Sequence, residues 1–525
     1  MKQKYRIIFI LLFLFFFTGP FLALFIKFFV EKNILTVEIS EITRRIKLFA
    51  NSLGLAAFVS LSSSVVGLIM GLNIWRQKGL LRLFFLLTVV SMLFLPSYIH
   101  AQSWIFLVDR VNTLLENLQI NQIFFDGFLA SWWVEMLSFL PICILFTYAG
   151  LCAINVHTLE AGLIYDSFWR VILKILLPLI KTPLTAGASL VFLLSFNDYN
   201  IPSIFKFNVY ALEIFAEYSS TSSSVRALFL SLPVLLVTGV VTVWFLLWFR
   251  QRPFEGRWKG LYTDFNKFFG VFKYYEIAAF FIFMLQVLIP LIALSLESSH
   301  AVGIIDILTD SMHEILYSFM LSLFTSIILT PIALCVAFVL MKKNLISKVL
   351  WGASAIPLAV PASLSGIAFI QFFNNSVFQF AYGTWFMPVI SNTIRFMPFS
   401  VFFIYTGLKQ LDINLLDAVK VYQKNPFKRF LVFFHMTRAF LIANFFMTFS
   451  LVFGELGTTL MVVPPGYSTL TIKIYNYLHY GASDVVAVLC LFVYISAFLL
   501  AALIMLSYGL NKKYSFGEVN TNELN

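Results

Sequence analysis

Residues 150–161 read GLCAINVHTLEA, and residues 407–418, which start 257 positions later, read GLKQLDINLLDA. Both stretches open with Gly-Leu and close with an acidic residue followed by alanine. A second match, SLVF, starts at residue 189 and again at residue 450. Two matches in the same order predict an internal repeat. Repeats of this length are a common way to build membrane transporters from two homologous halves.

The amino-acid composition excludes an ordinary soluble domain, whose surface is solvated by water. Of the 525 residues, 60% are hydrophobic and 12% are charged, whereas a soluble domain is about 25% charged. A helix needs about 20 apolar residues to cross a bilayer core of about 30 Å. About twelve such runs occur, near residues 7–29, 50–74, 83–107, 128–153, 184–204, 226–249, 274–296, 314–341, 346–372, 382–406, 437–461 and 484–508. The sequence therefore predicts an all-α transmembrane fold with six helices in each of two homologous halves.

The Lys and Arg residues predict the topology. They gather in alternate loops, and the positive-inside rule places those loops and both termini in the cytoplasm of a bacterial inner-membrane protein. The net charge of +11 then reflects orientation in the membrane, and no nucleic-acid partner is needed to explain it. Arg44, Arg45 and Lys47 go against this pattern, because they fall on the outer side with no evident reason. The predicted units are a first half, a cytoplasmic linker, a second half and a cytoplasmic tail, at residues 1–249, 250–273, 274–508 and 509–525.

The repeat falls on a basic loop between the fourth and fifth predicted spans of each half. In the second half Asp412 or Asn414 can cap a short helix, and Asn425-Pro426 can start the next one, since proline fits the first helical turn. Taken alone, such a loop is typical of an amphipathic helix lying on the membrane surface.

The loop resembles the signature of permease subunits of ABC importers, which reads Glu-Ala-Ala, three residues, Gly, nine residues, Ile, one residue and Leu-Pro. Here the first loop starts with Glu160-Ala161-Gly162 and ends with Ile-Leu-Leu-Pro at residues 175–178, one residue short of the pattern. The second loop has Asp417-Ala418 but lacks the Leu-Pro, and the glycine of the signature is Asp166 or Gln423.

A second stretch strengthens the resemblance. Residues 453–466, FGELGTTLMVVPPG, resemble the fused two-half permeases of ferric-iron, thiamine and related importers, and residues 196–203 are the first-half counterpart. The resemblance implies a type I importer permease that takes its substrate from a separate binding protein. Ferric iron is the first candidate substrate, with thiamine, polyamines and other small ions left open.

The same resemblance implies the partners. Each loop would carry a coupling helix docked on a separate ATPase subunit, present in two copies, with docking points at Glu160, Ala161, Gly162, Asp417 and Ala418. The sequence has no Gly-x-x-x-x-Gly-Lys-Ser/Thr loop to cradle phosphates, so we expect no enzymatic activity and no cofactor in this chain. Whether both loops engage the ATPase equally stays open.

Substrate must cross where the two halves meet. The ends of the two fifth spans place polar residues there, namely Asn197, Asp198 and Tyr199 in one half and Glu455, Thr458 and Thr459 in the other. Carboxylates near the membrane are functional candidates, although Asp198 and Glu455 can equally cap helix ends or pair with Arg226 or Lys473. Glu135 follows Trp132 and Trp133, and we expect it at the membrane interface with these tryptophans as belt residues.

Two other function classes compete with the importer. A secondary transporter driven by an ion gradient needs titratable residues buried in the membrane, and the predicted spans show almost none. A membrane-embedded enzyme needs clustered His, Asp or Cys, but the six histidines and four cysteines are scattered without ligand spacing. We therefore predict no metal site, and read the cysteines as core residues.

Overall fold

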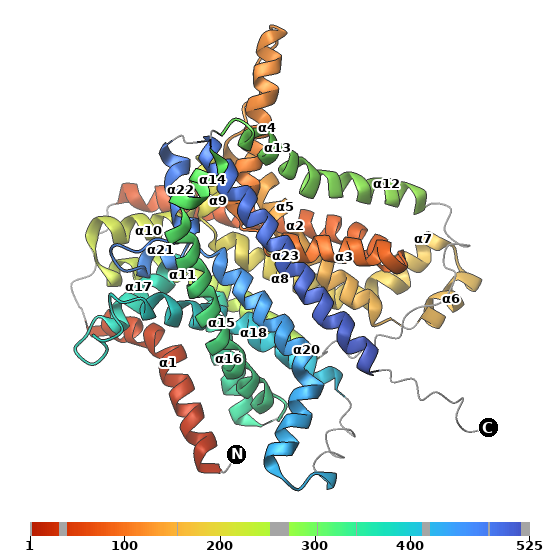
Figure 1. Ribbon diagram of the computed structural model, residues 1–525, viewed down its shortest axis with the longest axis vertical. Coiled ribbons are helices and arrows are strands. Elements are labelled where there is room, and N and C mark those ends of the chain that lie inside the picture. Colours follow the sequence, from red (N-terminus) through yellow and green to blue (C-terminus); the bar gives the residue numbers. More distant parts are fainter. Residues whose placement is uncertain are drawn as a thin grey trace.

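The computed structural model describes residues 3–30, 39–154, 156–251, 272–301, 303–342, 344–411, 421–480 and 483–515. Within these ranges the chain is helical and contains no strand, which confirms the predicted all-α class (Figure 1). The first half contains α1 (Gln3–Val30), α2 (Ile39–Arg76), α3 (Gly79–Leu93), α4 (Ser97–Asn117), α5 (Gly127–Cys152), α6 (Val156–Tyr165), α7 (Phe168–Val171), η1 (Ile172–Leu176), α8 (Leu177–Asn197), α9 (Asn200–Ile204), α10 (Tyr210–Thr221) and α11 (Ser224–Gln251).

The second half repeats this order of long and short helices. It contains α12 (Phe272–Phe283), η3 (Met284–Leu288), α13 (Ile289–Ser298), α14 (Ile304–Asp310), α15 (Met312–Leu340), α16 (Leu345–Ala359), α17 (Ala362–Phe373), α18 (Phe386–Gln410), α20 (Pro426–Phe453), α21 (Thr459–Val462), α22 (Leu470–Tyr480) and α23 (Ser483–Ser515). Ten spans in the described residues are long and apolar enough to cross a membrane, and two bent pairs raise the number to twelve if each pair is one span. The predicted number of about twelve agrees with that upper count.

The two bent pairs are the third span of each half. α3 and α4 are bent by 99°, and α16 and α17 by 113°, where the sequence predicted continuous helices at 83–107 and 346–372. Pro96 and Pro361 stand directly before α4 and α17. Proline disfavours the helical conformation in the residue before it, so each helix ends there and a new one starts at an angle. The matching bends follow the internal repeat.

The fifth predicted span, at residues 184–204, is wrong by half its length. The structure begins this span at Ile172 and ends it at Asn197, and the apolar residues beyond it belong to the separate short helix α9. Lys174 and Lys181 lower the mean hydropathy of the first turns of this span, so the predicted span started after them. Hydropathy averaged over a window does not resolve the break at Asn197, because the polar stretch at residues 197–200 is short and apolar residues lie on both sides of it.

α2, α5 and α8 pack closely because small residues lie at their crossings. A Cβ atom on Gly67 of α2 would stand 2.6 Å from the Cβ of Cys143 in α5, and one on Gly150 of α5 would stand 2.3 Å from the Cγ of Pro183 in α8. Glycines let helix backbones approach in a bilayer, where apolar side chains give no hydrophobic driving force between helices. The repeated Gly150 is therefore a packing residue.

A Gly150→Ala variant is expected to lower thermal stability, because Pro183 is a rigid ring and cannot move aside. Overpacking of this kind costs about 1–3 kcal/mol. Gly239 of α11 is the matched control, since a Cβ there meets nothing within 4 Å. Gly239→Ala should instead gain up to about 1 kcal/mol of helix propensity. Thermal unfolding of the detergent-solubilised chain measures both, and equal midpoints for the two variants would contradict the prediction.

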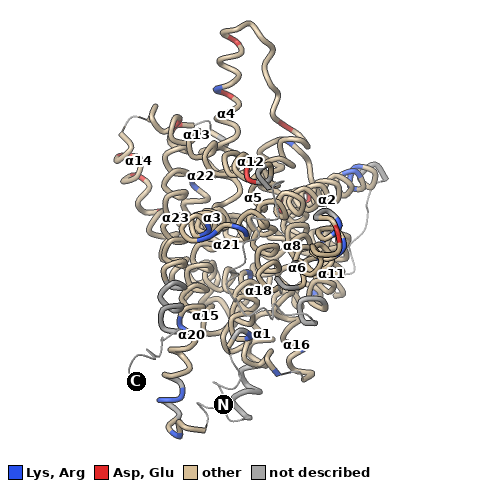
Figure 2. The backbone as a smooth tube through the Cα atoms, turned by 90° about the vertical axis from the view of Figure 1, so that its right-hand side faces the viewer, with Lys and Arg blue, Asp and Glu red and all other residues tan. Residues whose placement is uncertain are grey.

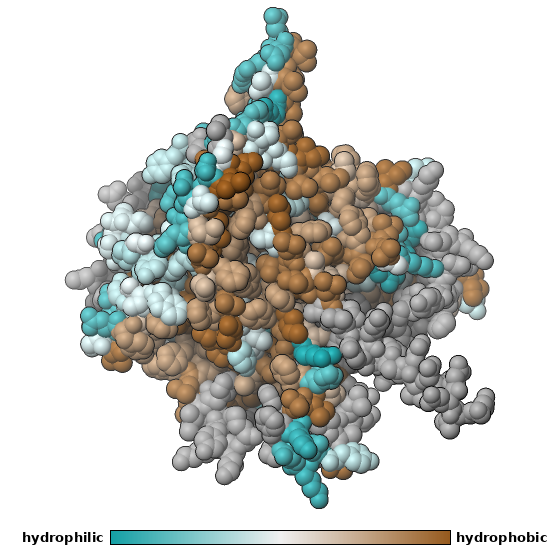
Figure 3. All heavy atoms as spheres, viewed as in Figure 1, coloured by the Kyte–Doolittle hydropathy of each residue, from teal (hydrophilic) through white to brown (hydrophobic). Residues whose placement is uncertain are grey.

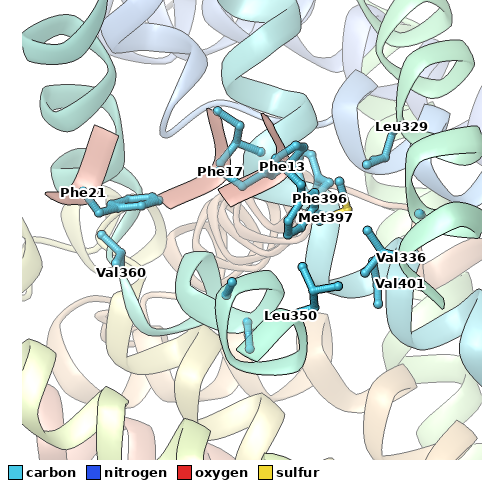
Figure 4. Packing of buried hydrophobic residues seen from close by; sticks show 14 of the residues in the cluster. Phe13, Phe17, Phe21, Leu329, Val336, Leu350, Val360, Phe396, Met397 and Val401 are labelled. Atoms are coloured by element: carbon cyan, nitrogen blue, oxygen red, sulfur yellow. The ribbon is translucent and has the colours of Figure 1, made fainter. Parts of the chain in front are cut away.

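The two halves interlock through their first and third spans. Figure 4 shows Phe13, Phe17 and Phe21 of α1 lying among apolar side chains that include Val360 and Phe396 of the second half. In the reverse direction, α13 packs on α4, where Arg110 and Glu297 form an ion pair of 3.1 Å. Each half therefore packs its first span against the third span of the other.

The outer surface suits a lipid environment. Figure 3 shows hydrophobic residues over the middle of the visible face and hydrophilic residues toward the tip of α4 and the opposite end. In Figure 2 most of the tube is uncharged, and Lys and Arg mark the start of α20. Leu61, Leu236 and Leu499 are at least 60% exposed on different spans. Such a surface describes a multi-pass membrane protein, because water would leave large apolar patches unburied.

The boundaries of the predicted units stay predictions. α11 ends at Gln251 and α12 begins at Phe272, so nearly all of the linker predicted at residues 250–273 lies outside the described residues. α23 continues to Ser515, past the predicted end of the second half at residue 508.

Candidate functional site

The six residues predicted to line the path lie at equivalent places in the two halves. α8 ends at Asn197 and α20 ends at Phe453, and each is followed by a short helix, α9 or α21, and then by α10 or α22. A serine hydroxyl from another helix binds the first backbone N–H of α10, and an equivalent serine binds that of α22. Ser52 Oγ accepts the backbone N–H of Tyr210, and Ser318 Oγ accepts that of Leu470, both at 2.8 Å.

Each of these ends contacts the bend in the third span of the other half. Asn197 Nδ2 donates to the carbonyl oxygen of Leu358, next to the end of α16, at 3.4 Å. Conversely, a Cβ on Gly454 would stand 2.7 Å from the Cγ of Pro96, at the bend between α3 and α4. The polar ends of the fifth spans therefore lie at the interface between the halves.

Glu455 belongs to an ion pair that the sequence did not reveal. Arg395 Nε of α18 lies 3.2 Å from Glu455 Oε1, and 9% of the Glu455 side chain and 22% of the Arg395 side chain are exposed. The same carboxylate oxygen accepts the backbone N–H of Thr458 at 2.7 Å. Lys473, the partner considered from the sequence, instead pairs with Glu314 at 3.1 Å. A lone arginine inside the predicted span 382–406 was the signal for this pair.

Thr458 and Thr459 are fully buried and bonded within the second half. Thr458 Oγ1 donates to the carbonyl oxygen of Ala362 at the start of α17, at 3.4 Å. Thr459 Oγ1 accepts from Asn392 Nδ2 of α18 at 3.2 Å. These contacts tie the segment after α20 to the bend and to α18, which is a structural role that does not depend on substrate.

The first half has an acidic cluster at the corresponding place. Asp198 Oδ1 accepts the backbone N–H of Asn200 at 2.9 Å and the side-chain amide of the same residue at 3.0 Å. Ser195 links this segment to Glu135: its Oγ donates to the Glu135 carboxylate, and its carbonyl oxygen accepts the backbone N–H of Asp198 at 3.1 Å. Arg226 pairs with Glu217 at 3.9 Å instead of with Asp198.

The prediction that Glu135 lies at the membrane interface is wrong. α5 begins at Gly127, so Glu135 is more than two turns inside the helix, and none of its surface is exposed. Of its neighbours, Trp132 donates its indole N–H to Ser62 Oγ of α2 at 3.1 Å. The sequence could not place Glu135, because its position depends on where α5 starts.

Tyr199 is buried beside α10. It is 2% exposed, and its ring stacks on Phe215 of α10 with centroids 5.6 Å apart.

The basic residues that broke the topology pattern have acidic partners. Arg44 and Arg45, at the start of α2, form ion pairs with Glu213 of α10, and Arg45 also pairs with Glu217 at 3.5 Å. These pairs join the start of α2 to α10. Lys47 is exposed, and nothing in the structure explains it.

The first repeated loop is a helix packed on the start of the fifth span. Leu159 of α6 is buried, and a Cβ on Gly162 would stand 2.5 Å from the Cδ1 of Ile175 in η1. Ala161 is exposed, and Glu160 lies within α6, with its side chain outside the described residues. Asp417 and Ala418 also lie outside the described residues.

The Asp166 carboxylate, just after α6, is stabilised by its neighbours in the chain. Asp166 Oδ1 accepts the backbone N–H of Ser167 at 2.8 Å and lies 3.2 Å from the Arg170 guanidinium. These two contacts hold the pKa of Asp166 below its usual range. Asp166 therefore stays ionised at neutral pH at the end of this loop.

Exposed apolar residues recur at the same register in both loops. Ile164 and Tyr165 are 79% and 90% exposed, and Val421 and Tyr422, each 257 positions later, are 73% and 87% exposed. Sequence reasoning did not single out these pairs. The constant spacing of the repeat was the signal that could have found them.

Among the described residues, no group of three or more His, Cys, Asp and Glu side chains could hold a metal ion. The four cysteines are free, and Cys143 and Cys490 are buried.

Comparison with known proteins gives permeases of several transport systems, although no family model matches the chain. The spermidine/putrescine transport system permease protein PotC homolog of Mycoplasma genitalium is 28% identical over 148 residues, which cover 28% of this chain and 51% of that protein. A protein of Haemophilus influenzae named as ferric transport system permease protein FbpB 1 is 24% identical over 458 residues, 78% of this chain and 69% of its own length. For the 2-aminoethylphosphonate transport system permease protein PhnV of Salmonella typhi the identity is 24% over 122 residues, 23% of this chain and 46% of that protein. The chain thus spans about half the length of most of these relatives. Its relatives are permease proteins of transport systems for chemically different solutes.

Proposed function

We propose that this chain is the transmembrane permease subunit of an ATP-driven ABC importer and forms the path for a small solute delivered by a separate binding protein. The observation that carries the proposal is the pair of exposed apolar sites, Ile164-Tyr165 and Val421-Tyr422, at one register of two repeated loops. Large apolar side chains exposed on a polar loop are typical of a protein interface. Two equal sites fit two copies of one partner.

The partner of these sites is an ATPase subunit. In the proposed complex the coupling helices carry Glu160, Ala161 and Gly162 in one half and Asp417 and Ala418 in the other. α6 is short and backed by η1, so it can transmit a rigid-body movement to the fifth span, which continues from η1. ATP is bound and hydrolysed in that subunit, and this chain carries no cofactor and catalyses no reaction.

The proposed setting is the bacterial inner membrane, with the basic loops and both termini in the cytoplasm. The path runs between the halves, past Asn197, Asp198 and Tyr199 on one side and Glu455, Thr458 and Thr459 on the other. Ferric iron is the solute favoured by the stretch at residues 453–466. The names of the relatives add spermidine/putrescine and 2-aminoethylphosphonate as solutes of related systems.

An ion-driven secondary transporter is the second candidate. The sequence argued against it because its spans showed almost no buried titratable residues. Glu135, the one acid within a predicted apolar run, is fully buried within α5 and is the residue that such a carrier would use. Buried carboxylates are typical of proton-coupled carriers. The repeated exposed loops favour the importer, because a carrier that works alone has no use for two matched docking sites.

Gentle purification of the full chain from its native membrane, followed by mass spectrometry, separates the two functions. The importer requires an ATPase with a phosphate-binding loop, recovered in about two copies per chain. Recovery of the chain alone, together with proton- or sodium-driven uptake in liposomes, would establish the secondary transporter instead.

A double variant tests the coupling helices. Glu160→Lys with Asp417→Lys is expected to abolish solute uptake while ATP hydrolysis by the purified complex continues, because each change reverses a charge at a docking point. Glu116→Lys, an exposed acid near the end of α4, is the matched control and should leave uptake unchanged. Wild-type uptake by a well-expressed double variant would contradict the assignment.

A further inference from the structure

The two halves differ in charge at matched positions beside the proposed path. Pro141 of α5 and Pro398 of α18 stand 257 residues apart, like the glycines of the repeat, and set the register of the two helices. At this spacing Glu135 matches Asn392 and Ser138 matches Arg395, and Asp198 matches Glu455 in the segment after the fifth span. The second half therefore holds one acid and one base where the first half holds two acids and a serine.

In the second half, Arg395 neutralises Glu455. In the first half, no described residue neutralises Glu135 or Asp198. Arg395 lies 3.2 Å from Glu455. At the matched position Ser138 Oγ donates to the carbonyl oxygen of Val134 in its own helix, at 2.8 Å. Among the described residues, no Lys, Arg or His lies within ion-pair distance of Glu135 or Asp198. Two neighbouring carboxylates without a counter-ion are costly in a medium of low dielectric constant.

Several oxygen atoms around these acids are buried without a hydrogen-bond partner. They are Glu135 Oε1, Asn197 Oδ1, Asp198 Oδ2, Tyr199 Oη and Asn200 Oδ1. Leaving a buried polar atom unsatisfied costs about 1–3 kcal/mol, and more when the group is charged. Four of the five atoms are acceptors only, so a positively charged ligand is the chemistry that would satisfy them together. Glu135 itself has no exposed surface.

The cluster lies at the interface between the halves. Asn197, Asp198 and Asn200 are only partly buried, and Asn197 Nδ2 donates to the carbonyl oxygen of Leu358 in the other half. A cation that moves between the halves would therefore pass beside this end of the cluster.

We infer that Glu135, Asp198 and the side-chain oxygens of Asn197, Tyr199 and Asn200 form a cation-binding site, and that the transported solute is a cation. The second clause rests on the proposed importer function, whereas the site itself does not. A metal ion with oxygen ligands and an alkylammonium group satisfy the same set of carboxylate, amide and phenol oxygens. The anionic phosphonate group of 2-aminoethylphosphonate does not.

Binding to the purified full chain in nanodiscs, without ATPase or binding protein, tests the site. The probes are spermidine, ferric ion supplied from its citrate complex, and ethylphosphonate, which has the phosphonate group without an ammonium group. Binding is measured by calorimetry and by the shift in unfolding temperature. We expect one of the two cations to bind and the phosphonate not to bind. Spermidine binding alone assigns an organic cation, and ferric binding alone assigns the metal.

Three variants localise the site. Glu135→Gln and Asp198→Asn should each weaken cation binding at least about tenfold, the loss expected from one charge-assisted contact. Ser138→Arg copies the second half by supplying a guanidinium, and should abolish binding. Glu116→Gln, at an exposed acid near the end of α4, is the control and should leave binding within about threefold.

Two results would overturn the inference. In the first, neither cation binds and Glu135→Gln is more stable than the wild type. Glu135 and Asp198 would then be a protonated pair with a structural role only. In the second, a cation binds equally to all four variants. Both readouts use the isolated chain, so a failure to recover an ATPase in the purification above would refute the importer and leave the cation site standing.

Discussion

Uptake falls to background when Tyr165 and Tyr422 are both replaced by aspartate. The two side chains are 90% and 87% exposed in the described structure, so their replacement leaves the fold intact. In the proposed complex each tyrosine enters a groove on the ATPase, and buried tyrosines are typical centres of binding energy that cost at least about 2 kcal/mol when removed. A carboxylate in the same groove would be desolvated without a partner, which adds to the loss.

Solute uptake by membrane vesicles and co-purification of the ATPase measure this effect. Each single variant should retain part of the activity if the loops act independently, which also decides whether the two halves engage the ATPase equally. Tyr480 of α22 is the matched control, because it is 84% exposed and lies beyond the opposite end of α20. Full uptake by the double variant would exclude these residues from the docking sites.

Replacement of Arg395 by methionine is expected to have the second largest effect, on stability. It leaves Glu455 with only 9% of its side chain exposed and without its counter-ion. Breaking a buried ion pair from one side costs about 3–5 kcal/mol, and less to the extent that water reaches the site. Because Glu455 also binds the Thr458 backbone, the segment between α20 and α21 should loosen first.

The double variant Arg395→Met with Glu455→Gln separates charge from packing. Glutamine keeps an oxygen for the Thr458 N–H and carries no charge, so most of the lost stability should return. Thermal unfolding of the solubilised protein, followed by tryptophan fluorescence, gives the comparison. If Arg395→Met is as stable as the wild type, the ion pair contributes nothing to stability.

The internal repeat was the most informative feature of the sequence. Its constant spacing of 257 residues identifies matched positions in the two halves even where the residues differ. Glu135 and Asn392, or Ser138 and Arg395, share no chemistry, yet their separation of 257 identifies them as counterparts. The asymmetry between the halves could in principle be seen without coordinates. Its significance could not, because only the structure shows that Ser195 binds Glu135 through its hydroxyl and Asp198 through its backbone.

Errors in the predicted spans had a common cause. Hydropathy averages over a window, so it detects a long apolar run but not a change of direction within it. The bends before Pro96 and Pro361 lie among apolar residues, and the polar stretch that ends α8, at residues 197–200, is too short to divide an apolar run. Those breaks place polar side chains at the interface between the halves, so the least predictable positions are the ones closest to the candidate site.

The sequence by itself determined the all-α membrane class, the approximate number of spans and the presence of two related halves, because these follow from the length and order of apolar runs. The tertiary structure alone decided which charges are paired. Arg395 meets Glu455, and Arg45 meets Glu213 and Glu217, across separations of 60 to more than 160 residues. Ion pairing depends on a few ångströms between side chains, and that distance is set by helix bends and close packing that no local pattern in the sequence encodes.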